Sequence, residues 1–275
     1  MAGKGRAHRG YSVEAENCVA PRWYNARMKD VDDYLGRIGY DGSREPTLET
    51  LRGMQRAHFL NVPFENLDIM AGVRIEVDER VNFEKIVGKH RGGYCLELNG
   101  TFARMLRKMG FRVDVLAGRV FAEGHLSPAF SHMTTVVHLE EPWIADVGFG
   151  GRLIEPLRLH DSGDQLFGER RYVLANDGDH WFMTGTEPGN PPVAYTFTLE
   201  PREFSQFEPV NEWLQTSPDS RFTLGEVVSL GTEHGRMTLA PGRLIVTEGE
   251  AREEREIGSP EERATILREQ FGIAV

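Results

Sequence analysis

The spacing of apolar residues predicts helices in the N-terminal part of the chain. Residues 47–60 and residues 95–109 both carry apolar side chains three or four positions apart, which places them on one helical face. Thr47 is a suitable N-cap for the first helix, and Gly110 is a natural stop after the second. Residues 83–90 are a shorter helical candidate, whereas residues 62–68 break the period, so we expect a loop there.

After Gly110 the period changes from helical to alternating. Residues 111–121 alternate apolar and polar side chains, which predicts a half-buried strand. Further strand candidates are residues 131–139, 142–150, 193–200 and 243–249. Residues 259–272 begin with Ser259, Pro260 and Glu262, the start of a capped helix. Helices followed by strands and then by mixed elements indicate an α+β protein with two or three lobes.

Composition narrows the classes of protein that remain. The chain has 275 residues and a net charge of −10, and this acidic balance argues against nucleic-acid binding. Two cysteines, Cys18 and Cys95, are too few for a disulfide framework and favour a reducing compartment, so we expect a cytoplasmic protein. We expect neither a membrane span nor a signal peptide, because apolar runs are short. Residues 1 to about 28 are polar and are expected to be irregular.

Cys95 stands in the segment RGGYCLELNG, residues 91–100, at the predicted start of a helix. Cysteine reacts as the thiolate, and a helix N-terminus favours an anion. Gly92 and Gly93 would let the backbone turn tightly and leave the sulfur accessible. A lone cysteine is more often a packing residue, but this setting favours a nucleophile.

A cysteine nucleophile needs a base and a group that orients the base. His132 and His138 lie six residues apart on one strand candidate, and His132 opens that strand as a residue at its rim would. Asp146 lies within an apolar strand candidate, where a carboxylate needs a partner. A cysteine on a helix, with histidine and aspartate on adjacent strands, is the papain-like arrangement of a thiol nucleophile.

These residues stand in segments that resemble the arylamine N-acetyltransferases, also called N-hydroxyarylamine O-acetyltransferases. The resemblance runs from about Asp33 to the mid-220s. It rests on VPFENLD (62–68), RGGYCLELN (91–99), GFRVDVLAGRV (110–120), the strand of His132, ADVGFGG (145–151) and LQTSPDSRF (214–222). The RGGxCxExN and DVGFG patterns are specific in this order, and the intervals from Cys95 to His132 and to Asp146 are close to those of the family.

The resemblance implies a papain-like cysteine transferase fold with a helical bundle, a β-barrel and an α/β lid. The expected divisions are an extension at 1–29, a helical domain with the nucleophile at 30–110, a β-barrel domain with the histidine and aspartate at 111–220, and a lid at 221–275. It also implies a ping-pong reaction of xenobiotic metabolism. Acetyl-CoA would acetylate Cys95, and an arylamine, arylhydrazine or N-hydroxyarylamine would then take the acetyl group, with His132 as base and Asp146 as its orienting carboxylate.

The same resemblance assigns substrate contacts. Phe64 and Phe149 match residues that line the acceptor pocket. The matches to CoA contacts are Ser131, Thr216, Ser217 and Phe222. Glu65 and Arg91 match a pair that braces the cysteine loop, although by themselves they could be two solvated charges. No metal is expected, because Cys95 lacks a plausible ligand set once His132 and Asp146 are assigned.

Other functions stay open on the sequence. The same three residues would serve an amide synthase that closes a macrolactam from a carrier-bound polyketide. A thiol hydrolase, a transglutaminase-like protein and a binding protein with a relic triad are further alternatives, and the presence of all three residues argues against the last. The extension before residue 30 departs from the family, so we expect Cys18 to be dispensable. The sequence leaves the acceptor, the acyl chain and the oligomeric state open.

Overall fold

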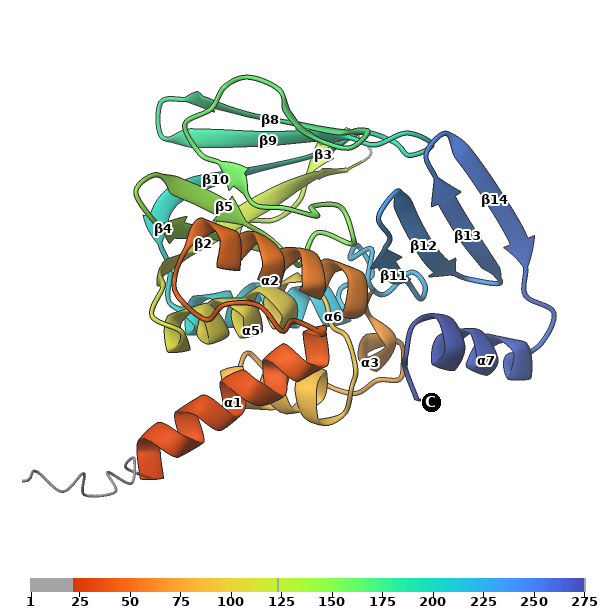
Figure 1. Ribbon diagram of the computed structural model, residues 1–275. Helices are drawn as coiled ribbons and strands as arrows, with labels where there is room; N and C mark the ends of the chain where they lie inside the picture. The colour runs from red at the N-terminus through yellow and green to blue at the C-terminus, as the bar shows by residue number, and fades with distance from the viewer. Residues whose placement is uncertain (1–21, 123, 275) are drawn as a thin grey trace, which may run out of the picture.

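A strongly curved sheet forms the upper part of the molecule, helices lie beneath it, and a smaller sheet stands at one side (Figure 1). The computed structural model describes residues 22–122 and 124–274. Apolar side chains gather in three core clusters: one among the helices, one inside the large sheet and one under the small sheet. The fold is therefore α+β, as expected.

The N-terminal part of the chain is helical. Its elements are α1 (Arg22–Ile38), α2 (Leu48–Asn61), α3 (Leu67–Met70), α4 (Glu79–Phe83), the π-helix η1 (Glu84–Gly88) and α5 (Cys95–Lys108). The predicted helices at 47–60 and 95–109 are confirmed. The Thr47 hydroxyl accepts a hydrogen bond from the backbone N–H of Thr50 at 3.2 Å, as an N-cap should.

Two expectations for this part were wrong. Residues 22–28 were expected to be irregular, but they form the start of α1. Residues 62–68 were expected to form a loop, yet they contain the short strand β1 (Phe64–Glu65) and the start of α3. Cys18 lies outside the described residues.

The large sheet is a nearly closed antiparallel barrel. Its strands are β2 (Arg112–Ala122), β3 (His125–Leu126), β4 (His132–His138), β5 (Pro142–Ala145), β6 (Leu157–Arg158), β7 (Gln165–Phe167), β8 (Arg170–Asp177), β9 (His180–Thr186) and β10 (Val193–Pro201). They are ordered β6-β5-β4-β2-β10-β9-β8-β7, with β3 paired to β2. The predicted strand at 142–150 was too long, because β5 ends at Ala145.

One side chain joins the two edges of the barrel. Gln165 on β7 accepts a hydrogen bond from the backbone N–H of Arg158 on β6 at 2.7 Å. Its side-chain amide donates to the Arg158 carbonyl at 2.9 Å. A glutamine amide thus replaces the backbone ladder at the seam of the barrel.

The small sheet links the C-terminal part to the helices. Its order is β1-β11-β12-β13-β14, with β11 (Val228–Gly231), β12 (Gly235–Ala240), β13 (Arg243–Glu248) and β14 (Ala251–Glu256). Helix α7 (Pro260–Gln270) packs on this sheet, and Ser259 caps it as predicted. The remaining helices are the 3₁₀-helix η2 (Phe204–Phe207) and α6 (Glu208–Thr216). Val210 and Leu214 of α6 belong to the core of the helices.

Candidate active site

Cys95 is the first residue of α5, so its side chain lies at the positive end of the helix dipole. The thiol is 3% exposed, and its Sγ lies 3.6 Å from the carbonyl oxygen of Ser131. The sulfur is therefore buried, and the expectation that it would be openly accessible was wrong.

The glycines around Cys95 are required by close packing. A Cβ on Gly92 would lie 1.9 Å from the Pro63 carbonyl oxygen, and one on Gly93 would lie 2.8 Å from the Cβ of Glu97. Neither glycine has a positive φ, so the expected tight turn does not explain why glycine occupies these two positions. A Cβ on Gly148 would lie 2.7 Å from the Cα of Cys95, which shows how closely the loop after β5 approaches Cys95.

His132 and Asp146 form a buried pair beside the thiol. His132 is the first residue of β4, and its Nε2 lies 2.7 Å from Oδ2 of Asp146. Asp146 directly follows β5, which pairs with β4. Cys95 is among the groups that raise the pKa of His132, so its side chain lies close to the ring. Since Nε2 is engaged by Asp146, Nδ1 is the ring nitrogen left for the sulfur.

His138 does not belong to this pair. It lies at the opposite end of β4 from His132, about 20 Å along a strand of this length. Its Nε2 lies 2.7 Å from Oδ2 of Asp114 at a partly exposed position. Of the two histidines that the sequence offered, the structure brings His132 to Cys95.

Asn99 is a site residue that sequence reasoning missed. It is fully buried on α5 and donates through Nδ2 to Oδ1 of Asp146 at 2.8 Å. Its Oδ1 accepts a hydrogen bond from the backbone N–H of Val147 at 2.8 Å. The N–H of Gly148 donates to the same Asp146 oxygen at 2.9 Å. The signal was its position four residues after Cys95, on the same helical face.

These contacts decide the charges of the pair. Burial alone would lower the pKa of His132, but the charge and hydrogen bond of Asp146 and the contact with Cys95 raise it to about 10. Burial would raise the pKa of Asp146, but His132, Asn99 and the Gly148 N–H hold it below its ordinary value. The arrangement therefore favours an imidazolium and a carboxylate at neutral pH.

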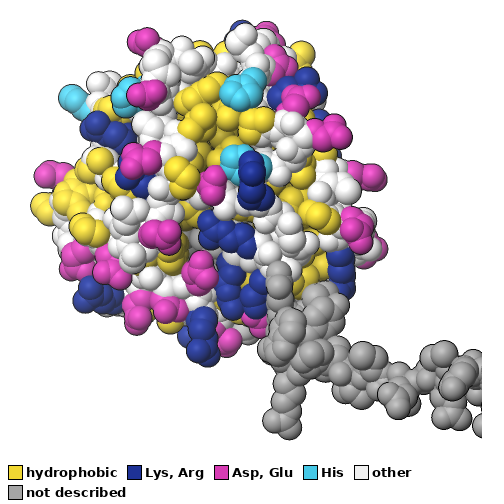
Figure 2. Space-filling view, turned by 90° about the vertical axis from the view of Figure 1, so that its left-hand side faces the viewer, with side chains coloured by type: hydrophobic (Ala, Val, Ile, Leu, Met, Phe, Trp, Pro, Cys, Tyr) yellow, Lys and Arg dark blue, Asp and Glu magenta, His cyan; other side chains and the backbone are white. Residues whose placement is uncertain are grey.

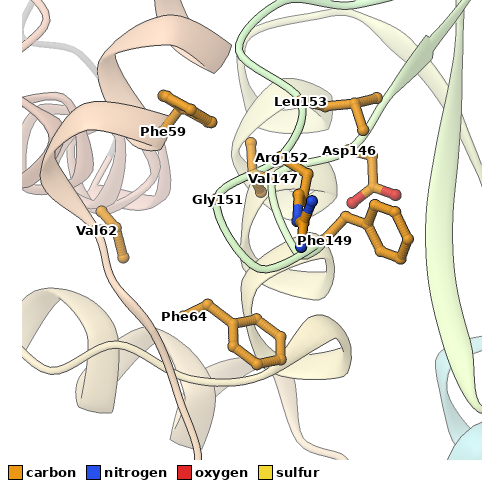
Figure 3. A pocket seen from close by; sticks show the side chains of 9 residues that line it. All are labelled: Phe59, Val62, Phe64, Asp146, Val147, Phe149, Gly151, Arg152 and Leu153. Carbon is orange, nitrogen blue, oxygen red and sulfur yellow. The ribbon is translucent and has the colours of Figure 1, made fainter. Parts of the chain in front are cut away.

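A pocket lies between α2 and β1 on one side and the loop after β5 on the other. Figure 3 shows Phe59, Val62 and Phe64 facing Asp146 and Phe149 across it. The Phe149 ring lies 5.1 Å from the His132 ring, centroid to centroid, and 5.0 Å from that of Tyr195. The structure thus brings Phe64 and Phe149 to one cavity at the edge of the buried pair. Tyr195, on β10, was not anticipated.

The four residues matched to CoA contacts lie in different settings. Ser131 is buried and its hydroxyl contacts that of Ser127. Thr216 is exposed at the end of α6, where its hydroxyl donates to the Glu212 carbonyl at 2.7 Å. Ser217 is the C-cap residue of α6. Phe222 is 7% exposed.

Glu65 and Arg91 form a partly buried ion pair. Glu65 is fully buried, and Arg91 donates to it through Nε at 2.9 Å and through a terminal nitrogen at 3.0 Å. Arg91 also contacts Asp68 at 3.0 Å. The reading as two solvated charges is excluded. Arg91 opens the segment that leads into Cys95, so the pair is placed to hold that segment.

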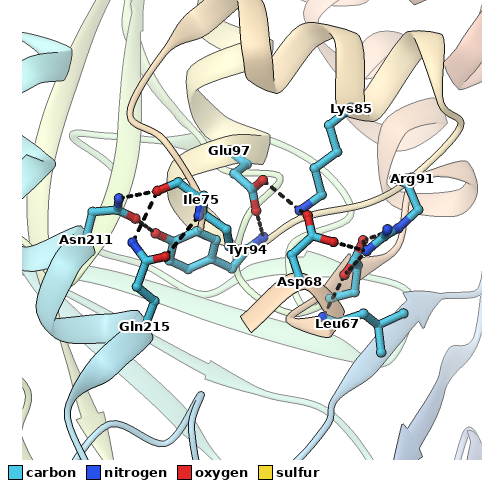
Figure 4. A network of polar contacts seen from close by, with 10 residues as sticks. Leu67, Asp68, Ile75, Lys85, Arg91, Tyr94, Glu97, Asn211 and Gln215 are labelled. Carbon is cyan, nitrogen blue, oxygen red and sulfur yellow. Dashed lines mark hydrogen bonds and ion pairs between the residues drawn. The ribbon is translucent and has the colours of Figure 1, made fainter. Parts of the chain in front are cut away.

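A second buried charge cluster continues from the first (Figure 4). Lys85 on η1 donates to Glu97 at 2.7 Å and lies 2.8 Å from Asp68. Glu97 accepts a hydrogen bond from the backbone N–H of Tyr94 at 3.1 Å. Burial raises the pKa of Glu97, and although Lys85 opposes this, the result is about 7.

None of the helices among the described residues is both long and apolar enough to cross a membrane. No three His, Cys, Asp or Glu side chains of those residues gather in a group that could hold a metal ion. The face in Figure 2 carries both acidic and basic side chains among the described residues.

The chain is similar to known proteins in both sequence and fold. Residues 47–275 match a family model described as N-acetyltransferase. The arylamine N-acetyltransferase of Escherichia coli is 34% identical over 250 residues, 89% of this chain and 89% of that protein. The solved arylamine N-acetyltransferase of Salmonella typhimurium has a TM-score of 0.83 and 33% identity, covering 89% of this chain and 91% of that one. The Mycobacterium marinum arylamine N-acetyltransferase solved in complex with CoA has a TM-score of 0.82 and 30% identity, covering 88% and 92%.

Proposed function

Because the chain belongs to the arylamine N-acetyltransferase family, we propose that it carries acetyl groups from acetyl-CoA to arylamines, arylhydrazines or N-hydroxyarylamines through an acetyl-cysteine at Cys95. The observation that carries the proposal is the 2.7 Å contact between His132 and Asp146 beside a thiol at a helix N-terminus. The relative solved with CoA supports acetyl-CoA as the donor.

In the first half-reaction, the Cys95 thiolate attacks the thioester carbonyl of acetyl-CoA. A bond forms between Sγ and the acetyl carbon, and the bond from that carbon to the CoA sulfur breaks. CoA leaves as a thiol with the proton that His132 held. The negative oxygen of the intermediate needs donors, and backbone N–H groups at the start of α5, including that of Cys95, are suited to this task because a first helical turn has no earlier carbonyls to bind them.

In the second half-reaction, the acceptor nitrogen attacks the acetyl carbon. His132 takes the proton of the amine through Nδ1, the bond from Sγ to the acetyl carbon breaks, and the acetylated amine leaves. The thiolate and the imidazolium are then restored. Asp146 keeps Nε2 of His132 engaged throughout, so it selects the tautomer and stabilises the charged ring.

The aromatic lining supports a flat acceptor. Phe64 and Phe149 face one cavity, and aryl rings stack on such side chains in offset or edge-on arrangements. We therefore expect arylamines to outperform simple alkyl amines. For the donor, we assign contacts to Ser131, Thr216, Ser217 and Phe222.

Trapping the acetyl-enzyme tests the proposal. Acetyl-CoA without acceptor should add one acetyl group, peptide mapping should place it on Cys95, and an arylamine should discharge it as the acetylated product. Steady-state plots at several acceptor concentrations should be parallel, as for a ping-pong reaction.

The two histidines of β4 give a matched pair of control variants. His132→Ala should lose acetylation of Cys95, whereas His138→Ala should retain it. An acyl-enzyme that forms only from long carrier-bound thioesters would favour the amide synthase. Folded protein that takes no acyl group on Cys95 from either kind of donor would contradict both functions.

A further inference from the structure

Tyr94, the residue immediately before Cys95, is held at both ends. It is fully buried, and its backbone N–H donates to the Glu97 carboxylate at 3.1 Å. Its side-chain hydroxyl donates to Oδ1 of Asn211 on α6, as Figure 4 shows. The residue that carries the chain into Cys95 is thus bonded to a helix more than a hundred positions later in the sequence.

Asn211 is itself fixed in orientation. Its Nδ2 donates to the Ile75 carbonyl at 2.9 Å, so Oδ1 is the atom turned to the Tyr94 hydroxyl. Gln215, one turn later on α6, accepts from the Ile75 N–H at 2.9 Å and donates to the Ile75 carbonyl at 3.1 Å. Both amide side chains therefore hold one backbone unit, and α6 cannot rotate without breaking these bonds.

The chain after α6 returns to Tyr94. The Ser220 hydroxyl donates to the Leu214 carbonyl at 2.5 Å, which ties this loop to the helix. The Phe222 ring then packs edge-on against the Tyr94 ring, with centroids 5.5 Å apart. Residues 216–222 are the segment assigned above to the acyl donor, so the donor segment meets Tyr94 through Asn211 and through Phe222.

We propose that Tyr94 and Asn211 are positioning residues that couple the donor segment 216–222 to Cys95. A CoA moiety that orders this segment would fix α6, and through Asn211 and Tyr94 it would fix the first turn of α5 with the sulfur. The inference rests on the proposed function, because it requires acetyl-CoA to bind along residues 216–222.

A buried tyrosine needs a hydrogen-bond partner for stability alone, so the test must separate stability from coupling. Tyr34 provides the matched control. It is also fully buried among the helices, and its hydroxyl bonds Nδ1 of His58 at 2.7 Å. Tyr34→Phe and Tyr94→Phe each remove one buried hydroxyl, but only Tyr94 adjoins the nucleophile.

The measurement is the rate of Cys95 acetylation by two donors, in rapid-quench experiments without acceptor. Acetyl-CoA carries the CoA moiety, whereas p-nitrophenyl acetate is an acetyl ester without it. Tyr94→Phe should slow acetylation by acetyl-CoA roughly five- to tenfold, the scale of one lost hydrogen bond, and should raise the acetyl-CoA concentration for half-maximal rate. Acetylation by p-nitrophenyl acetate should stay within about twofold of the parent protein. Tyr34→Phe should change neither rate.

Asn211→Ala should also slow acetylation by acetyl-CoA and spare acetylation by p-nitrophenyl acetate. The double variant Tyr94→Phe with Asn211→Ala should be acetylated by acetyl-CoA no more slowly than Asn211→Ala alone, because both substitutions remove the same bond. Normal reaction of a variant with p-nitrophenyl acetate also shows that its site is folded. Equal slowing with both donors, or unchanged acetyl-CoA rates in Tyr94→Phe, would overturn the coupling and leave the proposed function intact. A parent protein that neither donor acetylates would overturn both.

Discussion

Asp146 is the residue on which the charge of the site depends. In Asp146→Asn the side chain keeps its shape, so its bonds to Asn99 and Gly148 can largely persist and the fold should be retained. The amide can present an N–H to Nε2 of His132, which selects the wrong tautomer. We expect turnover of arylamines to fall by orders of magnitude; the equivalent change in serine proteases costs roughly ten-thousand-fold.

The His132 ring gives a second readout of the same variant. Its pKa is raised to about 10, so in the parent protein the ring should stay protonated through neutral pH and lose its proton only near pH 10. With Asp146→Asn the raising charge is gone and burial remains, so the pKa should fall. Nitrogen NMR of the imidazole measures this directly. An unchanged titration, with near-normal turnover, would mean that another residue orients His132.

Single residues of the site differed in how far they could be predicted. Cys95, His132 and Asp146 stand out because a reactive or charged side chain is unusual in an apolar setting, and the family motifs name them. Tyr195 carries no comparable signal, because it reaches His132 only through the pairing of β10 with β2 and of β2 with β4. The role of Asn99 was readable from its helical spacing to Cys95, provided that the buried face of α5 was considered.

At the scale of elements, the start of α5 carries a charge that should make stability depend on pH. The pKa of Glu97 is raised from 4.5 to about 7, mainly by burial. A raised carboxyl pKa means that the folded state binds the proton more tightly than the unfolded state. This tighter proton binding stabilises the folded state. Its contribution to the free energy of unfolding is complete below pH 4.5 and is lost as the pH rises through 7. Between pH 5 and 8, Glu97 should therefore lower the melting temperature as the pH rises.

Glu97→Gln should remove this part of the pH dependence. The fall in melting temperature from pH 5 to pH 8 should therefore be a few degrees smaller in the variant than in the parent protein. Calorimetry at both values checks it. Glu49→Gln, an exposed glutamate in the first turn of α2, is the control and should leave the difference unchanged. An identical pH dependence in Glu97→Gln would show that Glu97 is ionised in both states over this range.

Elements were predictable where burial gave them a regular pattern. The helices α2 and α5 and the strand β2 follow their apolar periods, with shifts of a few residues at their ends, and α7 begins at its predicted cap. Strand β14 is exposed along its whole length, so no alternation marks it. Strand β8 begins with a buried arginine, Arg170, which bonds Glu187 at 2.9 Å. Because a charged residue stands at a buried position, the sequence of β8 does not show the alternation of apolar and polar residues. Exposure therefore explains why the sequence did not reveal β14, and a buried ion pair explains the same for β8.

At the scale of the whole molecule, the seam of the barrel should be a weak point. Gln165→Ala removes the side chain that joins β6 to β7 and leaves the N–H and carbonyl of Arg158 without it. We expect a loss of about 1–3 kcal/mol in the free energy of unfolding and faster hydrogen exchange at the Arg158 amide. Acetyl transfer should persist, because Gln165 is not among the site residues.

Gln206→Ala is the control, because this exposed glutamine also bonds a backbone N–H, that of Glu203 at 2.8 Å, but at a helix start away from the seam. It should change stability much less. Equal losses in the two variants would argue that the Gln165 bonds contribute no more than an exposed cap.

The placement of Cys95 on α5 also bears on how such a protein can change over generations. Helix α5, which begins with the proposed nucleophile, is buried over most of its length, so its first turn and the centre of the fold are one segment. On the proposed mechanism, point substitutions at Cys95 abolish the chemistry and spare the scaffold. Substitutions along the helix that damage the scaffold also displace the sulfur. Evolution should therefore produce inactive proteins that keep this fold more easily than active proteins with a damaged fold. Such inactive copies would be available for new binding roles.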